Sequence, residues 1–189
     1  MQLTIAATTV CIVLLAGSVL SQMPIPTRPN GYGVGGPADA QVVVEMFICL
    51  LCPDSKAAWP VALQVMQTYG TRIHFRIHIF PLPYHTNACV AAQGLQVIAN
   101  FTNRDTDAIF RYTTLVFDKQ DMWSNGPTQN MTMLQVMDSL ASFVAEAGFM
   151  AKNEFLDGLK NSYINQETRI AWKYACSRGE RIQNDSEKM

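Results

Sequence analysis

The sequence predicts an α/β fold in which a strand–helix–strand unit is followed by a large helical block. Three segments support this prediction: an apolar, β-branched run over 41–48, a helix-like run over 53–69 and an alternating run over 72–80. Strand, helix and strand within about 40 residues form a βαβ unit, so we expect the two strands to be parallel. Over 86–178 apolar residues recur every three or four positions, as they do in helices.

The first strand is expected over 41–48, where the residues read QVVVEMFI. Its nearly continuous apolarity is typical of a strand buried on both faces, as in a parallel sheet. The preceding segment, 22–40, is rich in proline and glycine, so we expect a flexible, exposed lead-in. Residues of this lead-in could join the two expected strands of the sheet.

The helix of the βαβ unit is expected to start just after Cys52. Pro53 suits a first helical position, and Asp54 adds the acidic residue favoured there. Pro60 falls inside the run and predicts a kink, and Gly70 ends the helix.

The second strand is expected over 72–80, which reads RIHFRIHIF. Its period-two pattern divides the side chains between two faces. One face carries Ile73, Phe75, Ile77 and Ile79, and the other carries His74, Arg76, His78 and Phe80. We expect the first face to be apolar and buried, and the histidines to lie on a polar face.

The helical block, 86–178, contains several segments with helical periodicity and no internal repeat. The expected helices span 86–101, 105–120, 132–148, 151–163 and 166–178. The remaining residues, 180–189, form a polar tail that we expect to be frayed. We therefore divide the chain into a lead-in, one α/β domain over 41–179 and this tail.

The N-terminal residues, 1–21, have the features of a signal peptide. They contain no charged side chain, and the apolar stretch over 5–20 is shorter than the roughly 20 residues that a membrane-spanning helix needs. We expect cleavage after Ser21. No other stretch approaches that length, so no membrane association is expected after cleavage.

Three sequons, at Asn100, Asn130 and Asn184, predict glycosylation in the same compartment. We therefore expect a secreted protein or one of the endoplasmic reticulum lumen. Composition agrees with a globular chain, with 49% hydrophobic and 15% charged residues. The net charge is −1 and no basic run occurs, which argues against a nucleic-acid partner.

Cys49 and Cys52 stand where the first strand passes into the helix. Sulfurs three residues apart can close a small disulfide, and a helix N-terminus stabilises a thiolate that attacks a partner's disulfide. This logic makes Cys49 the nucleophile and Cys52 the resolving thiol. If Pro53 is the first helical residue, however, Cys52 is the N-cap and Cys49 lies outside the helix. The apolar Leu50-Leu51 spacer also disfavours a thiolate.

With this arrangement the chain resembles the DsbA-like branch of the thioredoxin superfamily, particularly its eukaryotic secreted members. The resemblance covers 41–179 and is most recognisable in FICLLCPDSKAAWP (47–60), HIFPLPYH (78–85) and WKYACSRG (172–179). It implies that the helical block is an insertion, after which the family fold resumes with a cis-proline turn, two strands and a helix. The sequence ends before such a part, so we expect this C-terminal β-β-α part to be missing.

The resemblance implies a thiol–disulfide oxidoreductase that acts on cysteine-containing protein substrates and uses no cofactor. The alternative is a non-catalytic thioredoxin-like module with structural disulfides that binds a protein partner. Cys89 and Cys176 are interpreted either as a structural disulfide or as free thiols. His74 and His78 follow the two cysteines after a gap longer than zinc fingers use, so no metal site is expected.

Overall fold

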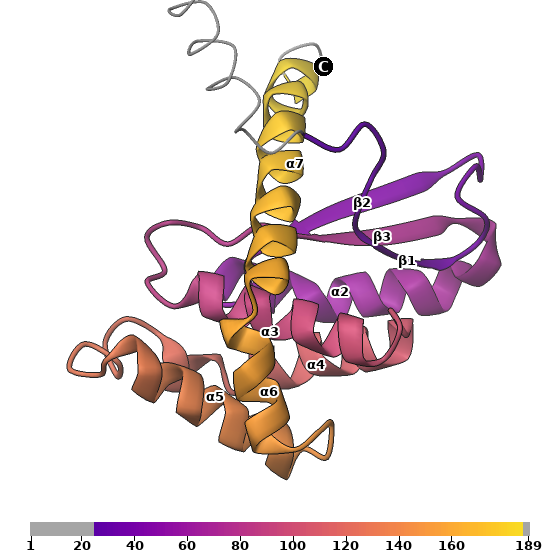
Figure 1. The fold of residues 1–189 in the computed structure, drawn as a ribbon. Coiled ribbons are helices and arrows are strands. Elements are labelled where there is room, and N and C mark those ends of the chain that lie inside the picture. The colour runs from indigo at the N-terminus through magenta and orange to yellow at the C-terminus, as the bar shows by residue number, and fades with distance from the viewer. Residues whose placement is uncertain (1–24, 187–189) are drawn as a thin grey trace, which may run out of the picture.

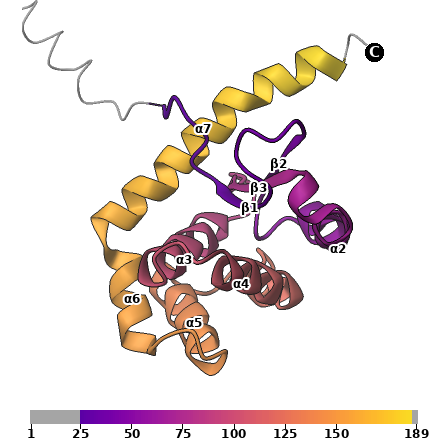
Figure 2. The same ribbon diagram turned by 90° about the vertical axis from the view of Figure 1, so that its right-hand side faces the viewer.

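The computed structural model describes residues 25–186, and the side chains of residues 25–179. A three-stranded sheet with helices on both faces forms its core (Figures 1 and 2). The elements are β1 (Tyr32–Gly35), β2 (Val43–Ile48), α2 (Pro53–Tyr69), η1 (Gly70–Arg72), β3 (His74–Ile79), α3 (Ala88–Phe101), α4 (Thr106–Asp118), η2 (Gln120–Trp123), α5 (Met133–Glu146), α6 (Lys152–Lys160) and α7 (Ser162–Ser186).

The sheet has the strand order β1-β3-β2, with β2 parallel to β3 and β1 antiparallel to β3. The parallel βαβ unit predicted from the sequence is thus confirmed. Helix α2 begins at Pro53, as expected, and continues through Pro60 to Tyr69. Because β2 lies at the sheet edge, Val43 remains 43% exposed, so the prediction of a strand buried on both faces is wrong for its first half.

The lead-in, 22–40, is not wholly flexible, because it contributes β1. Tyr32 and Val34 alternate with glycines, and Tyr32 is buried with its hydroxyl donating to Gln96 Oε1 at 2.6 Å. The glycines allow the rings of two histidines to lie close to the backbone of this segment. A Cβ on Gly31 would come 2.7 Å from His78 Nδ1, and a Cβ on Gly33 would come 2.6 Å from His74 Nε2. A glycine-rich composition therefore conceals a strand here.

The helical block contains the five predicted helices with small shifts in their ends. The boundary between α6 and α7 falls at Asn161. Its side chain accepts a hydrogen bond from the Tyr163 amide at 2.8 Å, which caps the N-terminus of α7. Helix α7 then runs on to Ser186, so the expected frayed tail is helical up to that residue. Between residues 25 and 186 the structure has no helix long and apolar enough to span a bilayer.

The two faces of the sheet are covered by different helices. Figure 2 shows α7 over one face and α2 and α4 over the other. The face carrying Phe75, Ile77 and Ile79 is buried, as predicted. The histidines were expected to lie on a polar face, but both are buried: Tyr174 of α7 stacks on His78, and the lead-in packs against His74, whose Nδ1 lies 2.8 Å from the Gly36 carbonyl oxygen.

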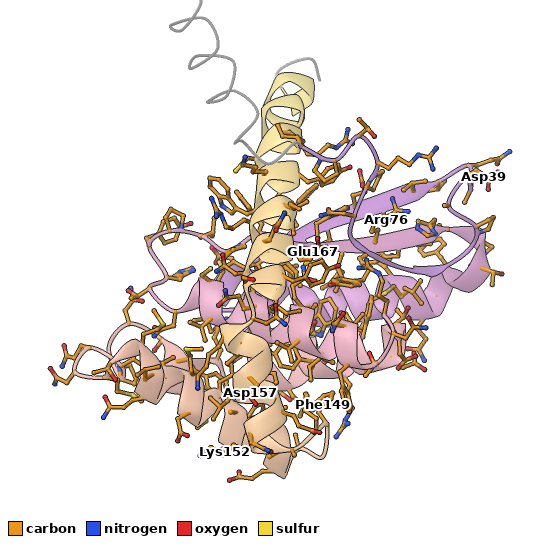
Figure 3. The ribbon with its side chains drawn as sticks, in the orientation of Figure 1. Asp39, Arg76, Phe149, Lys152, Asp157 and Glu167 are labelled. Atoms are coloured by element: carbon orange, nitrogen blue, oxygen red, sulfur yellow. The ribbon has the colours of Figure 1, made fainter. Side chains whose placement is uncertain are left out.

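A polar cluster centred on Glu45 joins this face to α7. Glu45 Oε1 lies 2.9 Å from His78 Nε2, and Glu45 Oε2 lies 3.0 Å from Arg178 Nη2. Arg76, labelled in Figure 3, approaches the same carboxylate at 3.8 Å. The His78 ring stacks between Phe47 and Tyr174, with centroids 4.7 and 5.0 Å away. The carboxylate is thus surrounded by three basic side chains from two parts of the chain.

Burial lowers the pKa of His78 below its ordinary 6.5, although Glu45 opposes the shift, and Arg76 and Arg178 add to it. Its Nδ1 has no hydrogen-bond partner among the described residues. Protonation at that atom would therefore bury an added charge with no acceptor.

We predict that stability decreases with acidification below about pH 6.5. A folded-state pKa below the unfolded value means that the unfolded chain binds more protons, so unfolding becomes easier as the pH falls through this window. Urea unfolding at several pH values between 7.5 and about 5 gives the slope of the unfolding free energy against pH. This interval lies above the pKa values of ordinary carboxylates. His78→Gln should flatten the slope, and an unchanged slope would contradict the role of His78.

Candidate functional site

The two cysteines of the motif lie in the turn that joins β2 to α2. Cys49 follows the last residue of β2, and the Cys52 amide donates to the Cys49 carbonyl at 3.0 Å, which closes the turn. Pro53 is the first residue of α2 and Cys52 is its N-cap. The arrangement with Cys49 outside the helix, left open by the sequence, is therefore the one observed.

Cys49 is almost fully enclosed, with 2% of its surface exposed, whereas Cys52 retains 8%. Two groups outside the motif approach the Cys49 sulfur: His85 Nδ1 at 3.3 Å and the Leu82 amide at 3.5 Å. Burial raises the pKa of the Cys49 thiol, and the backbone amides of Leu82 and Leu51 partly offset that rise. Cys49 is thus favoured as a thiol at neutral pH.

Cys52 stands at the N-terminus of α2. It is the N-cap of the 17-residue helix α2, whose first turn carries the positive end of the helix dipole. The Cys52 side chain makes no capping hydrogen bond. Ser55 of the first turn instead accepts from the Cys49 amide at 3.2 Å, which fixes the loop to the helix.

Gln120 holds the motif from the helical block. Its side-chain amide donates to the carbonyls of Leu50 and Cys52, both at 3.0 Å, and the side chain is buried. Sequence reasoning missed this residue because it is 70 positions from Leu50 and belongs to no motif. Its contacts explain how a block of helices supports a turn of the α/β unit.

A pocket of about 350 Å³ lies beside the motif, between the loop after β3 and helices α3 and α7. Its walls are mostly apolar and include Pro81, Leu82, Pro83, His85, Cys89 and Trp172. His85 belongs both to this wall and to the surroundings of the Cys49 sulfur. The volume suits one large side chain or a small ligand.

The other predicted site residues lie apart from the motif. Cys89 is exposed on the pocket wall and Cys176 is half-buried on α7, and burial raises the pKa of both thiols. Cys49, Cys52, Cys89 and Cys176 are all free thiols, so no disulfide occurs between residues 25 and 179.

The histidines of β3 are structural in this fold. His74 Nδ1 lies 2.8 Å from the Gly36 carbonyl oxygen and its Nε2 2.8 Å from Arg76 Nη2. In the described part of the chain no cluster of three His, Cys, Asp or Glu residues could hold a metal ion.

Of the predicted glycosylation sites, Asn100 and Asn130 are exposed. The side chain of Asn184 and the predicted signal peptide, 1–21, lie outside the described residues. Glycosylation and cleavage remain predictions from the sequence.

We predict that Gln120→Met destabilises the protein by about 2 to 3 kcal/mol, because two buried carbonyls lose a donor. Equilibrium urea unfolding measures the loss. Gln129→Met, a change of the same kind at an exposed position, should stay within about 0.5 kcal/mol of wild type. Equal stability of the two variants would show that the Gln120 contacts do not support the loop.

The comparisons with known proteins show the fold. Neither the family models nor the curated proteins include a match to the sequence. Among solved structures, a protein described as a candidate protein-disulfide isomerase from Pseudomonas syringae matches with a TM-score of 0.66 and 18% identity, over 79% of this chain and 81% of that one. The α-DsbA1 of Wolbachia pipientis matches with a TM-score of 0.60 and 18% identity, over 82% and 70%.

DsbA2 of Pseudomonas aeruginosa is similar too, with a TM-score of 0.58 and 15% identity, over 82% of this chain and 77% of that one. At these sequence identities the similarity to the three solved structures shows a shared fold. It confirms the predicted fold class: the chain has a thioredoxin-like fold of the DsbA type, with a helical block following β3.

Proposed function

We propose that the chain is a thiol–disulfide oxidoreductase of the secretory pathway whose reacting groups are the sulfurs of Cys49 and Cys52. The main support is the position of Cys52 at the N-terminus of α2, one turn after Cys49, in a fold shared with DsbA-type proteins. The proposed compartment rests on the predicted signal peptide and sequons.

The geometry favours roles opposite to those predicted from the sequence. Cys52 is the N-cap at the positive end of the helix, and 8% of its residue surface is exposed against 2% for Cys49. Cys49 is enclosed, and burial raises its pKa. We therefore assign the attack on the partner to Cys52 and the second step to Cys49.

The reaction proceeds in two exchanges. The Cys52 thiolate attacks one sulfur of a partner's disulfide, which forms a mixed disulfide and releases the partner's other sulfur as a thiolate that takes up a proton. Cys49 then loses its proton and attacks the Cys52 sulfur, which forms the Cys49–Cys52 bond and releases the second partner thiol. The partner is reduced and the protein oxidised, and the reverse sequence oxidises a partner dithiol.

The partner we propose is a cysteine-containing protein segment, one of whose apolar side chains enters the pocket beside His85. The pocket adjoins the reacting sulfurs through His85, and Trp172 and the prolines give it apolar walls. An apolar side chain near the partner's cysteine would thereby align that cysteine with the motif.

Cys52→Ser should abolish reduction of insulin disulfides, because no thiolate remains at the helix terminus. Cys49→Ser should retain the first exchange and accumulate a mixed disulfide with the partner, seen as a mass increase lost on reduction. Cys176→Ser is the control and should behave as wild type. If neither wild type nor any of the three variants reduces insulin, the chain is instead a non-catalytic module.

Trp172→Ala should raise KM for insulin reduction about tenfold, for a loss of about 1.4 kcal/mol of binding. The kcat should change little, because Trp172 lies on the pocket wall, whereas the groups that approach the Cys49 sulfur are His85 and Leu82. A small aromatic disulfide that does not fill the pocket provides the control substrate. Equal KM increases for both substrates would argue against a side-chain subsite.

A further inference from the structure

The sulfur of Cys49 meets a histidine from a distant part of the sequence. His85 Nδ1 lies 3.3 Å from Cys49 Sγ, although 36 positions separate the two residues. The parallel pairing of the strands explains the contact. Ile48 pairs with Ile79, and the Phe80 amide donates to the Ile48 carbonyl at 2.7 Å. The segment that follows β3 therefore leaves the sheet next to the motif.

The position of His85 is fixed from both sides along the backbone. The Asn125 side chain accepts from the Thr86 amide at 2.9 Å and donates to the Tyr84 carbonyl at 2.8 Å. The His85 amide donates to the Leu82 carbonyl at 3.2 Å, and the His85 carbonyl accepts from the Ala88 amide at 2.8 Å. The Tyr84 ring lies edge-on to the imidazole, with centroids 4.7 Å apart. These contacts hold the imidazole close to the thiol.

His85 also connects an enclosed sulfur to the exterior. Cys49 is 2% exposed, whereas His85 is partly exposed and forms part of the pocket wall. A proton leaving the Cys49 thiol thus has an acceptor at 3.3 Å with an outlet to solvent. Imidazole is the side chain best suited to exchange protons near neutral pH.

The apolar spacer of the motif makes such a group necessary. Leu50 and Leu51 are buried and offer neither a proton acceptor nor a charge. Burial raises the pKa of Cys49, so the resolving thiol stays protonated until a base removes its proton. The Leu82 amide, 3.5 Å from the sulfur, would stabilise the resulting thiolate.

We propose that His85 is the catalytic base for Cys49 in the resolving exchange. This inference rests on the proposed function. His85 Nδ1 takes the Cys49 proton as the Cys49 sulfur attacks Cys52, the Cys52–partner bond breaks, and the departing partner thiolate takes up a proton. In the reverse direction the imidazolium returns its proton to Cys49 as the bond between the two cysteines opens.

The titratable groups that surround this pair come from four elements. Around Cys49 and His85 these groups are Cys52 of the motif, Tyr84 of the loop, Cys89 of α3, and Arg169 and Lys173 of α7. Cys89 and Cys176 would react with thiol reagents, so the test uses a Cys89→Ser/Cys176→Ser background that keeps only the motif thiols of the described chain.

Stopped-flow mixing with an aromatic disulfide separates the two exchanges, because each releases one coloured aromatic thiolate. The first phase reports Cys52 and the second reports Cys49. His85→Gln should leave the first phase unchanged and slow the second by about 10²-fold, the lower range for loss of a general base. An unchanged second phase would overturn the role of His85, whereas absence of both phases from the parent protein would overturn the proposed function.

Chemical rescue distinguishes a base from a structural residue. In His85→Ala the pocket beside the thiol can admit free imidazole, which should restore the second phase in proportion to its concentration. Cys49→Ser provides the control and should show no second phase with or without imidazole. Failure of imidazole to accelerate a folded His85→Ala protein would count against a proton-transfer role.

The parent protein supplies a test that needs no change at His85. Its second-phase rate should rise through neutral pH and then level off below pH 9.0, the ordinary pKa of the thiol. A rate that rises tenfold per pH unit through pH 9 would indicate simple thiol ionisation and overturn the proposal.

Discussion

The parallel pairing of β2 with β3 is the constraint on which the rest of the site depends. It carries the ends of both strands to the same edge of the sheet, so the turn after β2 and the loop after β3 meet. Cys49 and Cys52 come from the first, and Leu82 and His85 from the second. Neither segment alone contains a sulfur with a neighbouring base.

The helical block completes the site without supplying a reacting group. Gln120 binds the motif carbonyls, Asn125 fixes the backbone around His85, and Trp172 borders the pocket. There is a physical reason why the helical block supports the turn and the loop that carry the reacting groups. Backbone carbonyls and amides in a turn lack the partners that a helix or sheet provides, and side chains of a rigid neighbour satisfy them.

The sequence predicts those features that depend on neighbouring residues. Pro53 marks the start of α2, and the alternation of Phe75 and Ile77 identifies the buried face of β3. Periodicity shows which residues of β3 share a face, but it does not show what covers that face. The histidine face was therefore misjudged, because Tyr174 and Arg178, which cover it, lie nearly 100 positions further along the chain. The contacts of Gln120 with the motif are likewise set by tertiary structure and leave no local signal.

The ion pair between Glu45 and Arg178 spans 133 positions of the chain. A contact between residues so far apart in the sequence closes a large loop. Such contacts form slowly, because the chain loses conformational entropy before the contact can stabilise it. A chain that emerges N-terminus first completes β2 and β3 long before the partner of their histidine face has been made. During synthesis α7 is therefore not available to cover that face until nearly the whole described chain has been made.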